Sequence, residues 1–172
     1  ARPSIVVGAS DTGTIRHFDT TYAAFKLIAE GRVRHMPARQ GATLDFVPID
    51  HVARGIVALA GRMDAARGGT YHLVSGQPLP VEKFTGCIGA YPHFHEPELV
   101  PPERFEPAML PALERRLFRR VAGLYASYFQ RDPHFDDTDF RAMTGLPCPE
   151  TGTAYVGRLI DYCIAAGFLA ER

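Results

Sequence analysis

The sequence predicts an α/β protein with few strands and a mostly helical C-terminal half. Strand-like and helix-like segments alternate over residues 1–90, which is typical of α/β folds. Prolines then interrupt the chain after Tyr91, and helical periodicity returns beyond them. We therefore expect two regions: an α/β segment over residues 1–90, and a proline-rich connection with a helical subdomain over residues 91–172. A chain of 172 residues can bury a substantial core.

The composition narrows the classes of partner. The formal net charge is zero, whereas a general nucleic-acid or membrane-surface binder needs a basic excess, so we expect no nucleic-acid partner. No apolar run approaches the roughly 20 residues that span a bilayer, and the first residues do not read as a signal peptide. Cys87, Cys148 and Cys163 are too widely spaced for a disulfide framework or a zinc site. Reduced thiols in a cytoplasmic protein are the simplest interpretation.

The first element is a strand, and it opens the chain. Ile5, Val6 and Val7 form a short β-branched run that ends in Gly8. Such a strand needs neighbours on both edges and both faces, and little in the remaining residues is expected to supply them. We therefore expect the chain to be the C-terminal part of a larger α/β enzyme. Asp19 or Thr20 then caps a helix that runs through residue 30.

The next elements follow in the α/β order. Residues 46–49 are extended, because Pro48 excludes a helix interior. Asp50 is expected to cap a helix over residues 51–63 with one apolar stripe, formed by Val52, Ile56, Leu59 and Met63. A glycine pair leads into a second strand over residues 70–74. Residues 77–80 read as a loop, and residues 81–88 read as a short helix.

Beyond the prolines the pattern is helical. A helix is expected over residues 111–129, with an apolar face of Leu113, Leu117, Val121, Leu124 and Tyr128. Its opposite face carries a basic stripe of Arg115, Arg116, Arg119 and Arg120, which is either solvated or a dock for an acidic partner. Asp136 or Asp137 caps a helix that stops at Gly145. The last helix covers residues 153–166, and residues 168–169 pack back on it.

Two constellations suggest chemistry and also have structural explanations. The turn over residues 8–13 resembles a phosphate-binding loop, but only Gly8 and Gly13 are present, and no strand that ends in an acidic residue follows about 20 residues later. A turn that lines a pocket is the alternative. Tyr22 and Lys26 share a helix face, where the lysine can lower the phenol pKa for proton donation. The alternative is an amphipathic helix with Tyr22 partly buried and Lys26 solvated.

Two further motifs are weaker. Asp50 or His51 can be an acid or base, but a helix cap explains the aspartate at that position. The alternating His93 and His95, followed by Glu96, can bind a metal from a strand, but no further ligand set is evident and the setting indicates a surface loop. We expect no metal site.

Three segments, taken in order, carry a resemblance to a known family. Residues 2–8 resemble the strand that follows the catalytic helix in extended short-chain dehydrogenase/reductases, most closely in the thioester-reductase and fatty acyl-CoA reductase ("male sterility") branch. Residues 45–53 are similar to that branch's VPVDxVA segment, and residues 70–76 to the later strand. Residues 135–169 are loosely similar to the helical tail of acyl reductases.

The resemblance implies a Rossmann-like fold with NADP or NAD bound mainly by an N-terminal half that this chain lacks. That half would hold the glycine-rich loop and the catalytic Ser/Tyr/Lys set, so no catalytic residue is expected here. Pro3 and Ser4 match the strand end that passes the nicotinamide. The loop over residues 8–18 would line the acyl pocket, through Ser10, Thr12, Thr14 and Phe18. The same alignment places Tyr22 and Lys26 after the catalytic helix.

Three functional hypotheses follow. The first is the substrate-binding C-terminal portion of an NAD(P)H-dependent reductase of acyl thioesters or related carbonyls, inactive and without tight cofactor binding alone. Its partners would be the missing nucleotide-binding half and an acyl carrier or CoA thioester. The second is a non-catalytic interaction domain that forms a homodimer. The third is a compact short-chain reductase that uses Ser10, Tyr22 and Lys26.

Overall fold

A computed structural model describes residues 1–119 and 132–170, and its contacts divide the chain into two compact units. The first unit contains residues 1–15, 44–79 and 134–162, and the second contains residues 16–43, 80–133 and 163–172. Each unit takes chain from both sides of residue 90, and the functional boundary expected there stays a prediction. Within the described residues, no helix combines the length and the apolar character that crossing a membrane requires.

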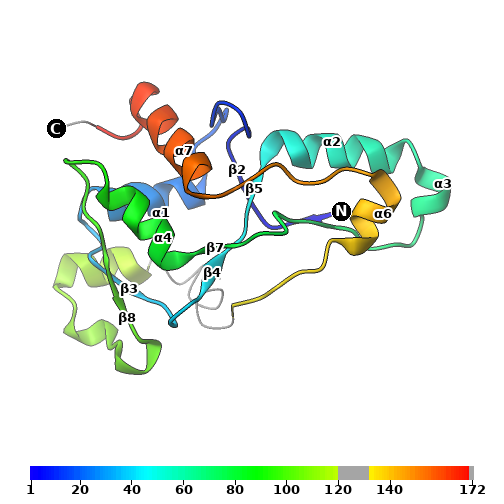
Figure 1. The fold of residues 1–172 in the computed structure, drawn as a ribbon. Helices are drawn as coiled ribbons and strands as arrows, with labels where there is room; N and C mark the ends of the chain where they lie inside the picture. Colours follow the sequence, from blue (N-terminus) through cyan, green and yellow to red (C-terminus); the bar gives the residue numbers. More distant parts are fainter. Residues whose placement is uncertain (120–131, 171–172) are drawn as a thin grey trace. The chain divides into compact units, whose positions relative to one another are not determined.

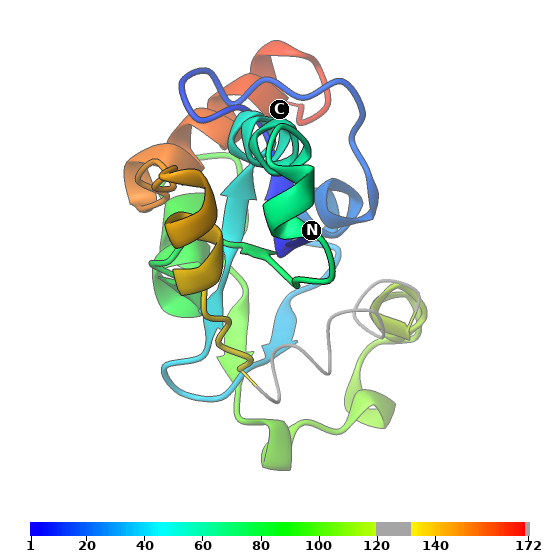
Figure 2. The same ribbon diagram turned by 90° about the vertical axis from the view of Figure 1, so that its right-hand side faces the viewer.

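The first unit contains two parallel strand pairs. Strand β2 (Ile5–Val7) pairs with β5 (Phe46–Pro48), with Ile5 opposite Phe46, and the two run side by side in Figure 2. Strand β1 (Arg2–Pro3) pairs with β6 (His72–Leu73). The N–H groups of Arg2 and Ser4 bond towards β6, whereas that of Ile5 bonds to the Asp45 carbonyl. The expected strand is confirmed, and β5 supplies a neighbour on one edge of β2, whereas β6 pairs with the preceding β1.

Helices α2 (Ile49–Ala60) and α6 (Thr138–Thr144) bury the core of this unit against these strands (Figure 1). The buried core residues are Val47, Val52, Leu59, Tyr71, Leu73 and Phe140. The short α3 (Met63–Ala66) follows α2. A Cβ on Gly55 would lie 2.8 Å from both Leu73 and Phe140, so the helix places its glycine against the core.

That glycine explains one error of the sequence analysis. Val52 and Leu59 face inwards as expected, but Ile56 is 48 % exposed and Met63 is 56 % exposed. The inward face is centred on Gly55, which has no side chain and therefore gives no signal in an apolar pattern. The expected cap was also wrong, because α2 begins at Ile49 after Pro48 and no side chain caps its amino end.

In the second unit, local signals predicted the helices well. Helix α1 (Thr20–Ala29) begins where the Asp19 carboxylate accepts a hydrogen bond from the Thr21 N–H, and Gly31 follows it with φ +68°. Helix α4 (Val81–Gly89) is also confirmed. Strand β3 (His35–Pro37) pairs in parallel with β8 (Glu98–Val100), and neither strand was expected. Strand β4 (Thr43–Leu44) pairs with β7 (Leu79–Pro80), where a loop was expected, and the division into units falls within both of these strands.

The proline-rich segment contains short 3₁₀ helices at Pro102–Arg104 and Pro107–Met109, before residues 112–119 form an α-helix. The rest of the helix expected over residues 111–129 lies outside the described residues, and with it Arg120, Val121, Leu124 and Tyr128. The buried side chains of residues 112–119 are Glu114 and Phe118, whereas Leu113 is 67 % exposed. The expected apolar face is therefore wrong at Leu113.

The two C-terminal helices begin and end close to where the sequence analysis predicted. The Thr138 N–H donates to the Asp136 carboxylate at the start of α6, and Gly145 ends this helix with φ +71°. Helix α7 (Thr153–Ala165) stops before Gly167. Leu169 is almost completely buried, so the chain packs back after the helix as expected.

Candidate functional site

The carboxyl ends of β2 and β5 lie at one edge of the parallel pair, where Val7 is opposite Pro48. The turn over residues 8–14 leaves β2 there, and α2 begins directly after β5. Open α/β folds bind their ligands outside the carboxyl ends of the strands. This edge is therefore the candidate functional site of the first unit.

Hydrogen bonds between Ser10 and Asp50 join the turn over residues 8–14 to the start of α2. The Ser10 backbone N–H donates to Asp50 Oδ1 at 2.8 Å, and its hydroxyl donates to Oδ2 at 2.9 Å. Arg54, one helical turn later, donates from Nη2 to Oδ2 at 2.9 Å. Partial burial raises the pKa of Asp50, but the Ser10 bonds and the Arg54 charge outweigh it and leave this pKa lowered. The site thus holds a carboxylate whose charge is compensated.

The two glycines of the turn serve packing within the chain. A Cβ on Gly8 would lie 2.0 Å from the Gly13 carbonyl oxygen, and one on Gly13 would lie 2.5 Å from that of Arg158 on α7. The turn closes on itself through a bond from the Gly13 N–H to the Ala9 carbonyl. Atoms of the turn itself fill the space that a phosphate would need, and the Ser10 N–H already donates to Asp50. The geometry therefore does not support a phosphate-binding loop.

Helix α7 forms one wall of the site, which the sequence analysis missed. The Arg158 Nε–H donates to the Ser10 carbonyl at 3.2 Å, and the Tyr155 hydroxyl donates to the Gly8 carbonyl. The Tyr162 hydroxyl donates to the Ile15 carbonyl at 3.1 Å. These three side chains recur at i, i+3 and i+7, so a polar and aromatic stripe on α7 was the available signal.

Ser4 and Pro3 lie at the other end of β2. The Ser4 hydroxyl lies 2.9 Å from the Asp45 carbonyl and 3.2 Å from Asp45 Oδ1, which also accepts the Ser75 N–H at 2.8 Å. Asp45 is 2 % exposed, whereas Pro3 is exposed at the sheet margin. Four residues of extended chain separate Ser4 from Gly8 by about 13 Å, so the structure does not bring Ser4 and Ser10 together.

The remaining predicted substrate residues divide between the two units. Thr12 and Thr14 are exposed on the same turn as Ser10, where the Thr12 hydroxyl accepts the Thr14 N–H at 3.3 Å. Phe18 belongs to the second unit and stacks on Phe168 with ring centroids 4.1 Å apart. The structure thus brings together the three hydroxyl residues of the turn.

Comparisons with known proteins identify relatives of this fold. Residues 1–56 match the profile of an NAD-binding family described as Male sterility protein. The chain also superposes on the terminal R domain of the myxalamid PKS-NRPS pathway, with a TM-score of 0.68 and 21 % identity over 98 % of this chain. The chain thus shares the fold of part of this reductase domain. No curated protein matches it.

Two further reductase structures share this fold. One is a thiolation-reductase di-domain of an archaeal non-ribosomal peptide synthetase, with a TM-score of 0.67, 18 % identity and 97 % of this chain covered. The other is the reductase domain of a non-ribosomal peptide synthetase from Mycobacterium tuberculosis, with a TM-score of 0.53, 17 % identity and 98 % of this chain covered. This chain spans 44 %, 36 % and 46 % of the three solved chains, in the order given.

Within this reductase fold, Tyr22 and Lys26 have structural contacts. Tyr22 is 3 % exposed and meets Phe168 edge-on. The Lys26 ammonium donates to the Phe168 carbonyl at 2.7 Å and lies 3.8 Å from the Glu30 carboxylate. These contacts favour the packing interpretation of the pair, and Ser10 belongs to the other unit.

The other titratable candidates also pack in the structure. His51 is 2 % exposed with its ring edge-on to Phe140, and burial, followed by the Arg54 charge, lowers its pKa. Burial also raises the pKa of the half-buried Cys148 thiol to about 12, so it remains protonated. His95 donates its backbone N–H to the Ala29 carbonyl. In the described part of the chain, no three His, Cys, Asp or Glu side chains group as metal ligands.

Proposed function

We propose that this chain is the substrate side of an NAD(P)H-dependent reductase that acts on an acyl thioester or a related carbonyl. The observation that supports it is the Ser10–Asp50 tie, which fixes a hydroxyl-bearing turn at the carboxyl edge of β2 and β5. That edge is the ligand-binding edge of an α/β fold. Thr12 and Thr14 stand exposed on the same turn.

Each residue of the turn has a distinct role in this proposal. The Asp50 carboxylate accepts hydrogen bonds from both the backbone N–H and the hydroxyl of Ser10. Towards a substrate, the Ser10 hydroxyl oxygen therefore acts as a hydrogen-bond acceptor. The exposed hydroxyls of Thr12 and Thr14 supply donors to an amide or acyl carbonyl of the substrate. Phe18 belongs to the second unit, and its predicted contact with the acyl chain stays a prediction.

Pro3 and Ser4 are the proposed contacts to the cofactor, which supplies the hydride when bound. The exposed Pro3 ring can pack on a flat nicotinamide ring. The Ser4 hydroxyl donates towards Asp45 and keeps its lone pairs for a carboxamide N–H. The rest of the cofactor would be bound by a nucleotide-binding half outside this sequence.

An acyl carrier or a CoA thioester would deliver the substrate. One solved structure with this fold is a thiolation-reductase di-domain, which joins a carrier to a reductase in one chain. In this proposal the exposed polar groups of the turn over residues 10–14 contact the delivered thioester.

The test uses the whole reductase with Ser10→Ala and Asp50→Asn. Both changes loosen the turn, so we expect KM for the acyl thioester to rise about threefold to tenfold while kcat changes less, as expected for lost binding contacts. Asp64→Asn is the matched control, because Asp64 is exposed on α3, away from the turn. An unchanged KM in folded Asp50→Asn protein would contradict the proposed role of the turn.

A second candidate function is association with another copy of the chain. Its support is the outer face of α2 and the start of α3, where four large apolar side chains are exposed: Ile49, Ile56, Val57 and Met63. Apolar patches of this kind mark association surfaces. We expect light scattering to detect a dimer that Val57→Glu converts to a monomer, with Asp64→Asn as the neutral control. A monomeric wild type over the micromolar range would remove this candidate.

A further inference from the structure

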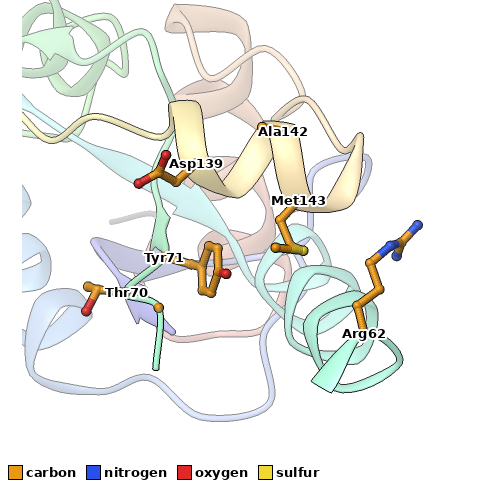
Figure 3. Close-up of a pocket in the computed structure, with 7 residues that line it drawn as sticks. Arg62, Thr70, Tyr71, Asp139, Ala142 and Met143 are labelled. Carbon is orange, nitrogen blue, oxygen red and sulfur yellow. The ribbon is translucent and has the colours of Figure 1, made fainter. Parts of the chain in front are cut away.

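A cavity lies at the opposite end of α2 from the Ser10–Asp50 tie. Its volume is about 420 Å³, within the range of small-molecule sites. The lining residues are Arg62, Gly69, Thr70, Tyr71, Asp139, Ala142 and Met143, and Figure 3 shows their arrangement. All belong to the first unit. The 12 residues of α2 span about 18 Å, so this cavity is separate from the proposed substrate turn.

The Tyr71 hydroxyl marks this cavity as a place for a polar ligand. Tyr71 is 8 % exposed and its ring belongs to the core, yet the hydroxyl has no hydrogen-bond partner among the described residues. Among the described residues, every fully buried side-chain oxygen has a hydrogen-bond partner. The Tyr71 hydroxyl has none among them, so it is not fully buried and is accessible from the cavity. A Cβ on Gly69 would lie 2.6 Å from this hydroxyl oxygen, so the glycine leaves room for it.

Opposite charges stand on two sides of the cavity. Figure 3 shows Asp139 of α6 on one side of the Tyr71 ring and Arg62, just past α2, on the other, with both charged groups directed outwards at the rim of the cavity. Both side chains are exposed, and neither has an ion-pair partner among the described residues; Arg62 donates only to the Ala58 carbonyl, at 3.4 Å. The Tyr71 ring and the Met143 side chain lie between them (Figure 3). The rim of the cavity thus carries a flexible negative group on one side and a flexible positive group on the other, and either can turn towards a ligand that covers the apolar surface between them.

We propose that this cavity binds a small zwitterion whose ammonium and carboxylate groups are joined by an apolar segment. The ammonium pairs with Asp139, the carboxylate pairs with Arg62, and the apolar segment covers Met143 and the Tyr71 ring. The Tyr71 hydroxyl donates to the ligand carboxylate or accepts from its ammonium. A ligand with one charge satisfies only one end and desolvates the other charge without compensation, so both charges are needed for full affinity.

The test is a titration of the chain, followed by NMR of its backbone amides. The ligands are glycine and the ω-amino acids aminobutyrate, aminohexanoate and aminooctanoate, compared with hexanoate and hexylamine. We expect saturable shifts at residues 69–71 and 139–143, an optimum at one chain length, and affinity about threefold to tenfold weaker for each single-charge analogue.

Three variants assign the contacts. Asp139→Asn removes the preference for aminohexanoate over hexanoate, and Arg62→Gln removes the preference over hexylamine. Tyr71→Phe keeps the ring and weakens the best ligand about threefold to tenfold. Asp64→Asn and Arg67→Gln are the controls, since both residues are exposed nearby and do not line the cavity.

Either of two results overturns the proposal. One is the absence of saturable shifts at the cavity for every ω-amino acid in the millimolar range. The other is equal affinity for aminohexanoate, hexanoate and hexylamine. Because Asp139 and Arg62 are exposed, their variants should keep the fold, and the test stands even if Tyr71→Phe is unstable.

Discussion

A glycine can be required by its backbone conformation or by close packing, and Gly13 and Gly41 differ in the second requirement. Their φ angles are +71° and +75°, so both backbones are in the region that disfavours a side chain. Gly13 also lies against α7, where a Cβ would be 2.5 Å from the Arg158 carbonyl oxygen. No atom lies within 4 Å of the position that a Cβ would take on Gly41. The pair therefore isolates the contribution of packing.

We expect Gly41→Ala to lower the free energy of unfolding by about 1 kcal/mol, because only the backbone is strained. Gly13→Ala should lower it by at least about 2 kcal/mol more, since the turn must also move away from α7. Urea denaturation followed by circular dichroism measures both values. Equal losses for the two variants would show that the turn does not pack on α7 as described.

Asp50 illustrates what single residues reveal in a sequence. Its place after an extended Pro48 marks the start of a helix, and a cap is the ordinary reason for an aspartate there. Its real partner, Ser10, lies 40 residues earlier in the chain. Nothing local indicates that pairing, since it depends on β2 and β5 lying side by side.

At the scale of elements, a buried carboxylate holds the helix at residues 112–119 against β3. Glu114 is 6 % exposed, and its Oε1 accepts the Arg34 N–H at 2.7 Å and the His35 N–H at 3.0 Å. His35 Nδ1 lies 3.1 Å from the same oxygen. Burial raises the pKa of Glu114, but these donors outweigh it and hold the pKa below its ordinary value of 4.5.

We expect this contact to weaken in acid. Because the folded pKa lies below the unfolded one, the stabilisation is complete above the unfolded value and is lost as the pH falls through the folded value. The wild type should therefore exceed Glu114→Gln in free energy of unfolding at pH 6, and the difference should shrink below about pH 4. Glu103→Gln, at an exposed site, should show no such trend. A pH-independent difference for Glu114→Gln would contradict this account.

Elements with strong local signals were predictable, and the short ones were not. Asp19 with Gly31, and Asp136 with Gly145, delimit α1 and α6 through caps that depend on neighbouring residues. Strands β3 and β8 have three residues each and contain or border prolines, so their pairing comes from tertiary packing alone. The turn over residues 8–14 was likewise predicted from its local glycines, but its contacts to α7 depend on tertiary packing and were not predicted.

At the scale of the whole molecule, the chain spans 44 % or less of two of its solved neighbours and 46 % of the third. We expect the chain alone to show no saturable NADPH binding in fluorescence titrations up to about millimolar ligand, since the proposed glycine-rich nucleotide loop lies in a half outside this sequence. A longer protein that includes this half should bind NADPH and reduce an acyl thioester. Thioester-dependent NADPH oxidation by the chain alone would contradict this division of labour.

The change of partner at Ser4 also has a consequence for the order of folding. Arg2 pairs with His72 and Ile5 with Phe46, roughly 70 and 40 residues further along the chain. Closing such large loops is slow, because their entropy is lost before the ladder hydrogen bonds form. During synthesis, residues 2–7 leave the ribosome before β5 and β6 and must wait for both. The pairing of β1 with β6 and of β2 with β5 is thus a late step of folding. Until then the edges of β1 and β2 are unpaired, and a chaperone or another chain can bind them.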